Sequence, residues 1–291
     1  EFLAKGLARV SDGAVCVFSD GAGPPDSDPF KIHREDGWAD NPAIIRKGDG
    51  GFLYATTDLA TIDFRVSEWG ADEIWYVVGV PQQLHFRQIF NAAARWGRRA
   101  EFHHVAFGSI LGEDRKLMKT RSGENVQLGD VLDEAVERAA VIAAKSPALD
   151  ERERAEVAEI VGIGAVKFAE LSQHRLTDYV FGWDKMLALT GDTAPYLLYS
   201  HVRSRAIFRK LGGESPFSAA AAAIVLGQAE EVTLARLLCR FGEVVPGVLD
   251  GFRPNLLAGY LLEVARAYHS FFEACPLLRA ETATRASRPA L

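Results

Sequence analysis

Apolar residues in the first hundred positions form short runs between turns, a pattern typical of a mixed α/β fold. Residues 14–18 (AVCVF) predict a strand, and residues 74–78 (IWYVV) predict a second strand that is covered on both faces. Residues 82–96 then carry helical spacing, and residues 102–107 predict a further strand. A strand–helix–strand order with short links predicts a parallel βαβ unit with a right-handed crossover.

Turn-forming residues fill the stretch between the first two strands. Residues 21–41 are rich in Gly, Pro and Asp and predict a surface loop. Residues 43–47 and 52–54 flank the Gly-rich residues 48–51, which predicts a β-hairpin.

Helical spacing of apolar positions marks the other segments. The predicted helices cover residues 59–69, 126–145, 151–171, 194–211, 217–245 and 254–274. Thr57 or Asp58 is placed to cap the first helix, and Pro246 with Gly247 to end the fifth. One face of that fifth helix carries Leu234, Leu237, Leu238, Phe241 and Val245. The second part of the chain is therefore predicted to be an α-helical bundle.

Composition narrows the class of protein. The chain has 291 residues, 48% of them hydrophobic and 25% charged, which excludes a disordered chain, a collagen-like repeat and a disulfide scaffold. The net charge of −6 argues against a uniformly basic nucleic-acid coat. It divides unevenly, because residues 189–291 carry 11 Lys or Arg and 9 Asp or Glu (+2), whereas residues 1–188 carry 22 and 30 (−8). We predict a domain boundary between these two parts.

Cysteine usage predicts reduced thiols in a cytoplasmic protein. Cys16, Cys239 and Cys275 lie far apart and form no C-x-x-C pair, so neither a disulfide framework nor a zinc site is expected, and Cys239 and Cys275 are predicted to be buried on helices. No apolar run reaches the roughly 18–20 residues of a membrane helix, and no secretory signal is visible.

A basic loop and a polar cluster are the candidate sites in the first part. Residues 115–121 contain four cations between a predicted strand and a helix, where they could neutralise a polyphosphate or simply form a solvated loop. Tyr54, Asp58, Gln82 and His85 follow predicted strands and could line one crevice, with Asp58 facing a guanidinium or ammonium group. Asp58 as a helix cap, Tyr54 as a packed aromatic residue and His85 as a core residue are the alternatives.

The helical part offers one cationic cluster. Arg203, Arg205, Arg209 and Lys210 lie on one predicted helix, where they could meet phosphates. A solvated helix face is the alternative.

Four motifs together resemble those of arginyl-tRNA synthetase, a class I aminoacyl-tRNA synthetase. They are residues 54–60 (YATTDLA), 76–86 (YVVGVPQQLHF), 116–123 (KLMKTRSG) and 191–199 (GDTAPYLLY). They occur in the family's order and spacing, and the resemblance covers essentially the whole chain. It implies the second half of a Rossmann-like class I catalytic domain over residues 1–188, followed by a truncated helical anticodon-binding domain of the DALR type over residues 189–291.

The resemblance implies ATP-dependent activation of L-arginine, with Mg²⁺ accompanying ATP, and transfer of the arginyl group to tRNA-Arg by a monomeric enzyme. Tyr54, Asp58 and Gln82 match the residues that hold arginine, and His85 matches a position near the nucleotide. The loop that matches the family's KMSKS motif implies ATP contacts by Lys116, Met118 and Lys119. Lys119, with Lys116 second, would stabilise the departing pyrophosphate.

In the helical part, the resemblance implies tRNA contacts by Arg203, Tyr260 and Phe272. Aromatic residues there would stack on unpaired bases. Core packing of Tyr260 is an equal alternative.

The chain departs from the family because the His-x-Gly-His motif is absent and residues expected at both ends are missing. We therefore expect a fragment that is inactive alone. A non-catalytic tRNA-binding module is the alternative function. A cysteinyl relative is a weaker alternative, since zinc-type Cys/His spacing is lacking.

Overall fold

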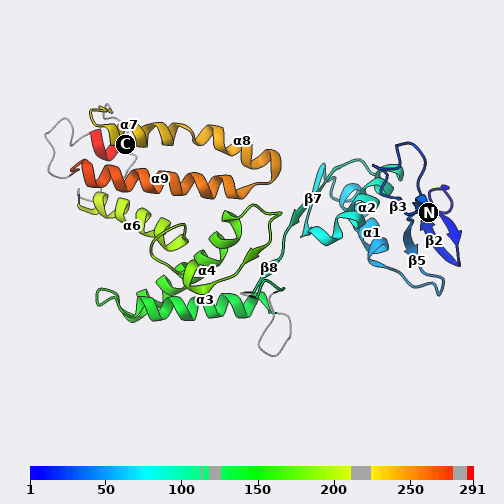
Figure 1. The fold of residues 1–291 in the computed structure, drawn as a ribbon, viewed down its shortest axis with the longest axis horizontal. Coiled ribbons are helices and arrows are strands. Elements are labelled where there is room, and N and C mark those ends of the chain that lie inside the picture. Colours follow the sequence, from blue (N-terminus) through cyan, green and yellow to red (C-terminus); the bar gives the residue numbers. More distant parts are fainter. Residues whose placement is uncertain (113, 118–125, 211–223, 278–286) are drawn as a thin grey trace. The chain divides into compact units, whose positions relative to one another are not determined.

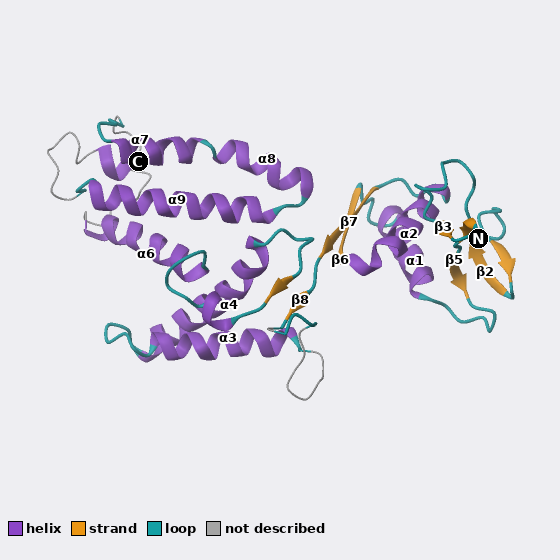
Figure 2. Ribbon diagram, in the orientation of Figure 1, coloured by secondary structure: helices purple, strands orange, loops and turns teal. Residues whose placement is uncertain are grey.

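The computed structural model describes residues 1–112, 114–117, 126–210, 224–277 and 287–291. These residues divide into two compact units, Glu1–Gly108 and Ser109–Leu291 (Figure 1). The first unit mixes strands and helices, whereas helices dominate the second (Figure 2).

The predicted βαβ unit forms the centre of the first unit. Its elements are β6 (Glu73–Gly79), the 3-10 turn η1 (Val80–Gln82), α2 (Gln83–Arg95) and β7 (Glu101–Phe107). β6 and β7 pair in parallel, as the sequence predicts. Ile74 and Tyr76 of β6 are buried, but Trp75 and Val77 are 52% and 63% exposed. The prediction that both faces are covered is therefore wrong, because the described core packs against one face of β6 only.

An antiparallel sheet and a helix precede this unit. They are β1 (Arg9–Ser11), β2 (Ala14–Val17), β5 (Ala43–Arg46) and α1 (Tyr54–Ser67). The Gly-rich turn does form, with the Lys47 N–H donating to the Gly51 carbonyl at 2.9 Å. The predicted hairpin is nevertheless wrong, since β5 pairs with β2 and the residues after the turn lead into α1.

The start of α1 also differs from the prediction. Leu53 is the N-cap residue, and its N–H donates to Thr56 Oγ1 at 3.2 Å, while the Thr56 hydroxyl donates to the Ile45 carbonyl. Thr57 and Asp58 lie inside the helix and do not cap it. The α1 start is thereby tied to β5, which leaves Asp58 free for another role.

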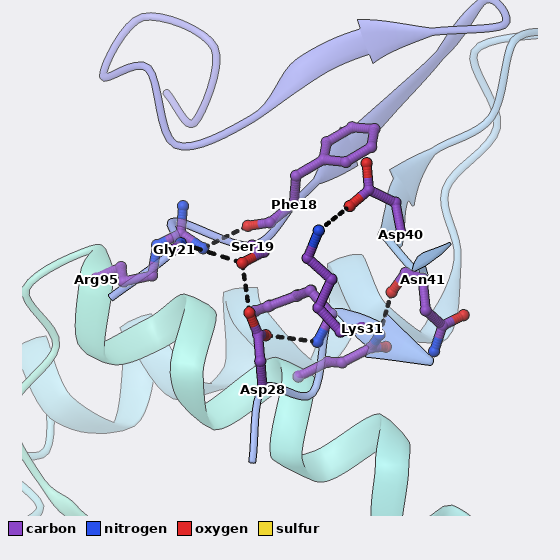
Figure 3. Close-up of polar contacts among 10 residues, drawn as sticks. Phe18, Ser19, Gly21, Asp28, Lys31, Asp40, Asn41 and Arg95 are labelled. Atoms are coloured by element: carbon purple, nitrogen blue, oxygen red, sulfur yellow. Dashed lines mark hydrogen bonds and ion pairs between the residues drawn. The ribbon is translucent and has the colours of Figure 1, made fainter. Parts of the chain in front are cut away.

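The predicted loop between β2 and β5 contains a hairpin. Its strands are β3 (Lys31–Arg34) and β4 (Gly37–Asp40), which pair antiparallel. Figure 3 shows the polar contacts around it: Lys31 Nζ lies 2.7 Å from Asp40 Oδ1, and Asp28 accepts the Ser19 hydroxyl. Arg95 of α2 donates to the carbonyl of the residue after β2 at 2.7 Å. These contacts anchor a polar segment that hydrophobic patterning alone does not reveal.

Seven helices span the described residues of the second unit. They are α3 (Leu128–Ala143), α4 (Glu151–Ser172), α5 (Trp183–Met186), α6 (Ala194–Lys210), α7 (Ala229–Cys239), α8 (Phe241–Gly251) and α9 (Pro254–Ala274). A short parallel sheet of β8 (Ile110–Leu111) and β9 (Tyr179–Val180) and a 3-10 turn, η3 (Arg288–Ala290), complete these residues. Figure 1 shows α7 and α8 running along α9, consistent with their packing contacts.

Small residues allow α3 and α4 to cross closely. A Cβ atom added to Gly162 of α4 would lie 2.7 Å from the backbone of Ala135 in α3. Ala135, Ala139 and Ala158 are almost fully buried at this contact. The crossing therefore has no space for a larger side chain at position 162.

The helix predicted over residues 217–245 is wrong in its extent. Its first residues lie outside the described ones; helix α7 begins at Ala229 and a break at Arg240 separates it from α8. Pro246 lies inside α8, where it is exposed and the residue four positions earlier is also exposed, so water can bind the carbonyl that Pro246 leaves without a partner.

Burial in this region also departs from the prediction. On the predicted apolar face Leu234 is 4% exposed, but Leu238 and Phe241 are 39% and 51% exposed. Cys239 is exposed rather than buried, whereas Cys275 is buried as predicted. The break at Arg240 changes the helical phase, so the five positions do not share one buried face.

Candidate functional site

Helix α1, the 3-10 turn η1 and helix α2 carry the four residues predicted to bind arginine or the nucleotide. Tyr54 begins α1 and is 87% exposed, and Asp58 lies one turn later on the same face. Gln82 ends η1 and is exposed, and His85 lies in the first turn of α2. Gln82 and His85 follow a parallel strand, as expected, whereas Tyr54 begins a helix instead of ending a strand.

The structure brings two of the four together. His85 Nε2 lies 2.6 Å from Asp58 Oδ2, and the two side chains are 27% and 29% exposed. A contact of this length is typical of a charge-assisted hydrogen bond. The residues are 27 positions apart in the sequence, so α1–α2 packing creates the pair.

Tyr76 lies close enough to Asp58 for the carboxylate charge to affect it. Burial raises the pKa of Tyr76, and the Asp58 charge adds to that increase, while Arg65 opposes it. Arg65 donates to the Tyr76 hydroxyl at 3.4 Å. Tyr76 also packs against Phe86, with ring centroids 4.8 Å apart, so an aromatic core supports the helix that carries His85.

Only the beginning of the predicted phosphate-binding loop is described. Lys116 is exposed, its N–H donates to Asp114 Oδ1 at 3.1 Å, and its carbonyl accepts the Gly112 N–H at 2.8 Å. Arg115 has a φ of +59°, which completes this tight turn. Met118 and Lys119 lie outside the described residues.

On the helical unit, the predicted Arg203 and Phe272 contact each other. The Arg203 guanidinium carbon lies 3.8 Å from the Phe272 ring centroid, a cation–π geometry that joins α6 to α9. Arg203 also approaches His269 Nδ1 at 3.4 Å, and His269 Nε2 lies 2.8 Å from the Ser200 hydroxyl. Burial and the Arg203 charge lower the pKa of His269. The neutral ring thus links both helices.

Tyr260 occupies a different environment. It is 7% exposed, and its hydroxyl donates to the Leu237 carbonyl at 3.0 Å. Sequence reasoning missed Tyr199, which is 53% exposed with its ring centroid 5.8 Å from the Arg203 guanidinium. Its position four residues before Arg203 on one helix was the available signal. The ring of Tyr199 is therefore open to solvent, whereas the ring of Tyr260 is buried.

One cluster in the described residues has the spacing of metal ligands. Glu73 and Glu101 begin paired strands β6 and β7, and ligand atoms of these residues and His103 lie within 4.8 Å of one another. His103 Nε2 lies 3.1 Å from Glu73 Oε1, so the ring contacts a carboxylate of the neighbouring strand.

Comparisons with known proteins agree with this architecture. The family described as "tRNA synthetases class I (R), catalytic domain" matches residues 1–183, and the "DALR anticodon binding domain" matches residues 197–291. The chain belongs to the class I tRNA synthetases. The matching catalytic-domain family is the arginyl (R) type, which confirms the resemblance carried by the four motifs. The order of the two matches also confirms the prediction of a class I catalytic domain followed by a helical domain.

Named relatives are consistent with this family. The chain is 49% identical over 284 residues to an arginine–tRNA ligase of Thermobifida fusca, a match covering 97% of this chain and 47% of the relative. It is 43% identical over 292 residues to one of Laribacter hongkongensis, covering 99% and 48%. The chain thus spans about half the length of the curated relatives it matches.

Solved structures share the fold. The Thermus thermophilus arginyl-tRNA synthetase superposes with a TM-score of 0.79 at 24% identity, covering 97% of this chain and 51% of that one. The Plasmodium falciparum enzyme gives 0.76 at 22%, covering 99% and 46%. Among the described residues no helix has the length and apolar character needed to cross a membrane.

Proposed function

We propose that this chain is part of an arginine–tRNA ligase. The whole enzyme would activate L-arginine with ATP and Mg²⁺ and transfer it to tRNA-Arg, as a monomer in the cytoplasm. Asp58 carries the proposal, because it is a partly shielded carboxylate with one oxygen engaged, in a chain whose relatives are named arginine–tRNA ligases. A partly buried carboxylate is the group that a guanidinium or ammonium ligand requires.

The other roles are assigned by position. Tyr54 and Gln82 would hold arginine beside Asp58. Lys116, Met118 and Lys119 would contact ATP, with Lys119, and Lys116 second, stabilising the departing pyrophosphate. His85, matched to the nucleotide side, lies equally beside the arginine site through its contact with Asp58. We place the boundary between the catalytic and anticodon-binding parts at residues 188 and 189.

Direct titration of the purified chain tests the arginine site. L-arginine should bind, and L-citrulline, which lacks the guanidinium charge, should bind at least about tenfold more weakly. Asp58→Asn should remove this preference, whereas Asp63→Asn, which changes a carboxylate of α1 that pairs with Arg98, should keep it. Equal binding of the two amino acids by the unchanged chain would contradict the proposal.

The 291 residues alone should not catalyse activation. The His-x-Gly-His sequence that class I nucleotide sites are expected to contain is absent from the chain. ATP–pyrophosphate exchange with arginine and tRNA-Arg present checks this, and clear exchange above a no-enzyme control would contradict it.

A second proposal, tRNA binding without catalysis, is favoured by the Arg203 surface. Arg203 supplies a cation, and Tyr199 and Phe272 supply aromatic rings beside it. Both rings are at least partly exposed, and aromatic rings are suited to stacking on bases. Gel-shift titration with tRNA-Arg should show weaker binding for Arg203→Ala. Arg152→Ala, which removes an exposed charge from α4, is the matched control. Equal losses in both variants would indicate non-specific charge attraction only.

A further inference from the structure

The contact between His85 and Asp58 uses one of the two carboxylate oxygens. His85 Nε2 lies 2.6 Å from Oδ2 of Asp58. An ionised carboxylate only accepts hydrogen bonds, so Nε2 must carry the proton of the shared bond. Oδ1 has no hydrogen bond or ion pair to a described residue. The pair therefore leaves one anionic oxygen available for a ligand.

The surroundings hold the His85 ring in place. Its neighbour Phe86 is 4% exposed, and the two rings meet edge to face with centroids 5.1 Å apart. Phe86 in turn packs against Tyr76 and Phe90 in the core of the first unit. Because the His85 ring is held by its neighbours, it can hold an adjacent side chain in one orientation.

Within the part of the chain that the structure describes, Asp58 has no other support of this kind. It lies inside α1, so its carboxylate caps no helix N–H group. Arg65, on the same helix, is directed to the Tyr76 hydroxyl. Without His85, the Asp58 side chain would be free to rotate, and a ligand would have to immobilise it on binding.

We propose that His85 is a positioning residue for Asp58. It donates Nε2–H to Oδ2 and so presents Oδ1 to the cationic group of the amino-acid substrate. The inference rests on the proposed arginine site. It assigns His85 to recognition of the amino acid through Asp58, whereas the family resemblance places it near the nucleotide.

The two assignments differ in the ligand that a His85 variant affects. In the purified chain, His85→Ala should weaken L-arginine binding about tenfold, because a charge-assisted hydrogen bond is lost and Asp58 must be ordered anew. His85→Gln should restore most of the affinity, since its amide nitrogen can occupy the place of Nε2. Gln83→Ala, an exposed change on the same helix turn, should leave binding unchanged. Calorimetric titration measures all four proteins.

Nitrogen NMR of the histidine rings supplies a readout that does not depend on the ligand. The proton on His85 Nε2 should be protected from exchange in the unchanged chain and become exchangeable in Asp58→Asn. Unaltered arginine binding by His85→Ala, with or without weaker ATP binding, would overturn the inference while leaving the arginine site intact. Absence of arginine binding by the unchanged chain, with the NMR signature present, would instead contradict the proposed function.

Discussion

Two carboxylates, Asp58 in the first unit and Glu231 in the second, show opposite ways of satisfying a charge. Glu231 lies in the first turn of α7 and its side chain is 2% exposed. Its Oε2 accepts the N–H groups of Gly227 and Gln228, and its Oε1 accepts Arg288 Nε at 2.6 Å. Asp58 is 29% exposed and has one partner, on one oxygen, among the described residues. A saturated, buried carboxylate serves the fold, whereas a partly used one retains capacity for a ligand.

Removing the saturated carboxylate should have the largest effect. Glu231→Ala leaves Arg288 charged and nearly buried and leaves two N–H groups at the α7 start without an acceptor. Loss of one partner of a buried pair costs about 3–5 kcal/mol. Urea unfolding measured by circular dichroism at 222 nm should show a loss of that size in the helical unit. A change below about 1 kcal/mol would mean that water replaces these contacts.

The same carboxylate should make the helical unit sensitive to acid. Burial alone would raise the pKa of Glu231, but the Arg288 bond and the two N–H groups outweigh it and lower that pKa below 4.5. A carboxyl whose pKa is depressed in the folded state stabilises the fold above the pKa it has when unfolded, and that stabilisation is lost as pH falls through the folded-state pKa.

Urea midpoints measured from pH 6 down to pH 2.5 check this dependence. The unchanged chain should lose stability steadily below about pH 4.5, the reference pKa of a glutamate. Glu231→Gln should start from a lower stability and show a shallower decline over the same range. Parallel curves for the two proteins would show that other carboxyl groups dominate the acid response.

A smaller loss is expected when the partner cation is exchanged. Arg288 donates from Nε to Glu231 and from Nη1 to the Pro276 carbonyl at 2.8 Å. A lysine ammonium can keep the charge but cannot reproduce this divided geometry. Arg288→Lys should therefore cost about 1–2 kcal/mol in the same unfolding experiment. Arg236→Lys, an exposed change on α7, is the control.

The smallest effect on stability should come from the partly used carboxylate. Asp58→Asn keeps the shape of the side chain but loses its ionic contact with His85. Because both side chains of this contact are more than a quarter exposed, the free energy of unfolding should change by less than about 1 kcal/mol. Four of the five tryptophans lie in the first unit, so tryptophan fluorescence reports its unfolding. A loss as large as that of Glu231→Ala would show that Asp58 serves the fold and would remove the contrast.

The sequence predicts elements correctly where local pattern and tertiary packing agree. The strand at residues 74–78 is confirmed, although one of its faces is exposed. Helix α9 from Pro254 to Ala274 is confirmed because its apolar spacing matches the core that it packs against. The strand predicted over residues 52–54 is wrong, since a Gly turn favours a hairpin but does not determine the conformation of the next segment. The break at Arg240 is not predictable locally, because neither Gly nor Pro stands at residues 239–241.

The candidate site shows the same division. Motif order identifies the family and points to Asp58 and His85, but their contact spans 27 positions and arises only from the packing of two helices. The contact between Arg203 and Phe272 joins two helices that are distant in the sequence and is likewise not predictable from spacing. By contrast, the pairing of Tyr199 with Arg203 agrees with helical periodicity and could have been predicted.

The close crossing of α3 and α4 has a consequence for the order of folding. Gly162 fits against the backbone at Ala135, whereas Ala158 and Val166, one turn away on the same face of α4, carry side chains that would not fit there. A slip of one helical turn is therefore blocked sterically, so the position of the glycine sets the register of the two helices. Because the helices are consecutive in the chain, closing the loop between them costs little entropy. This helical pair is thus suited to form early and to act as a template on which the later helices assemble.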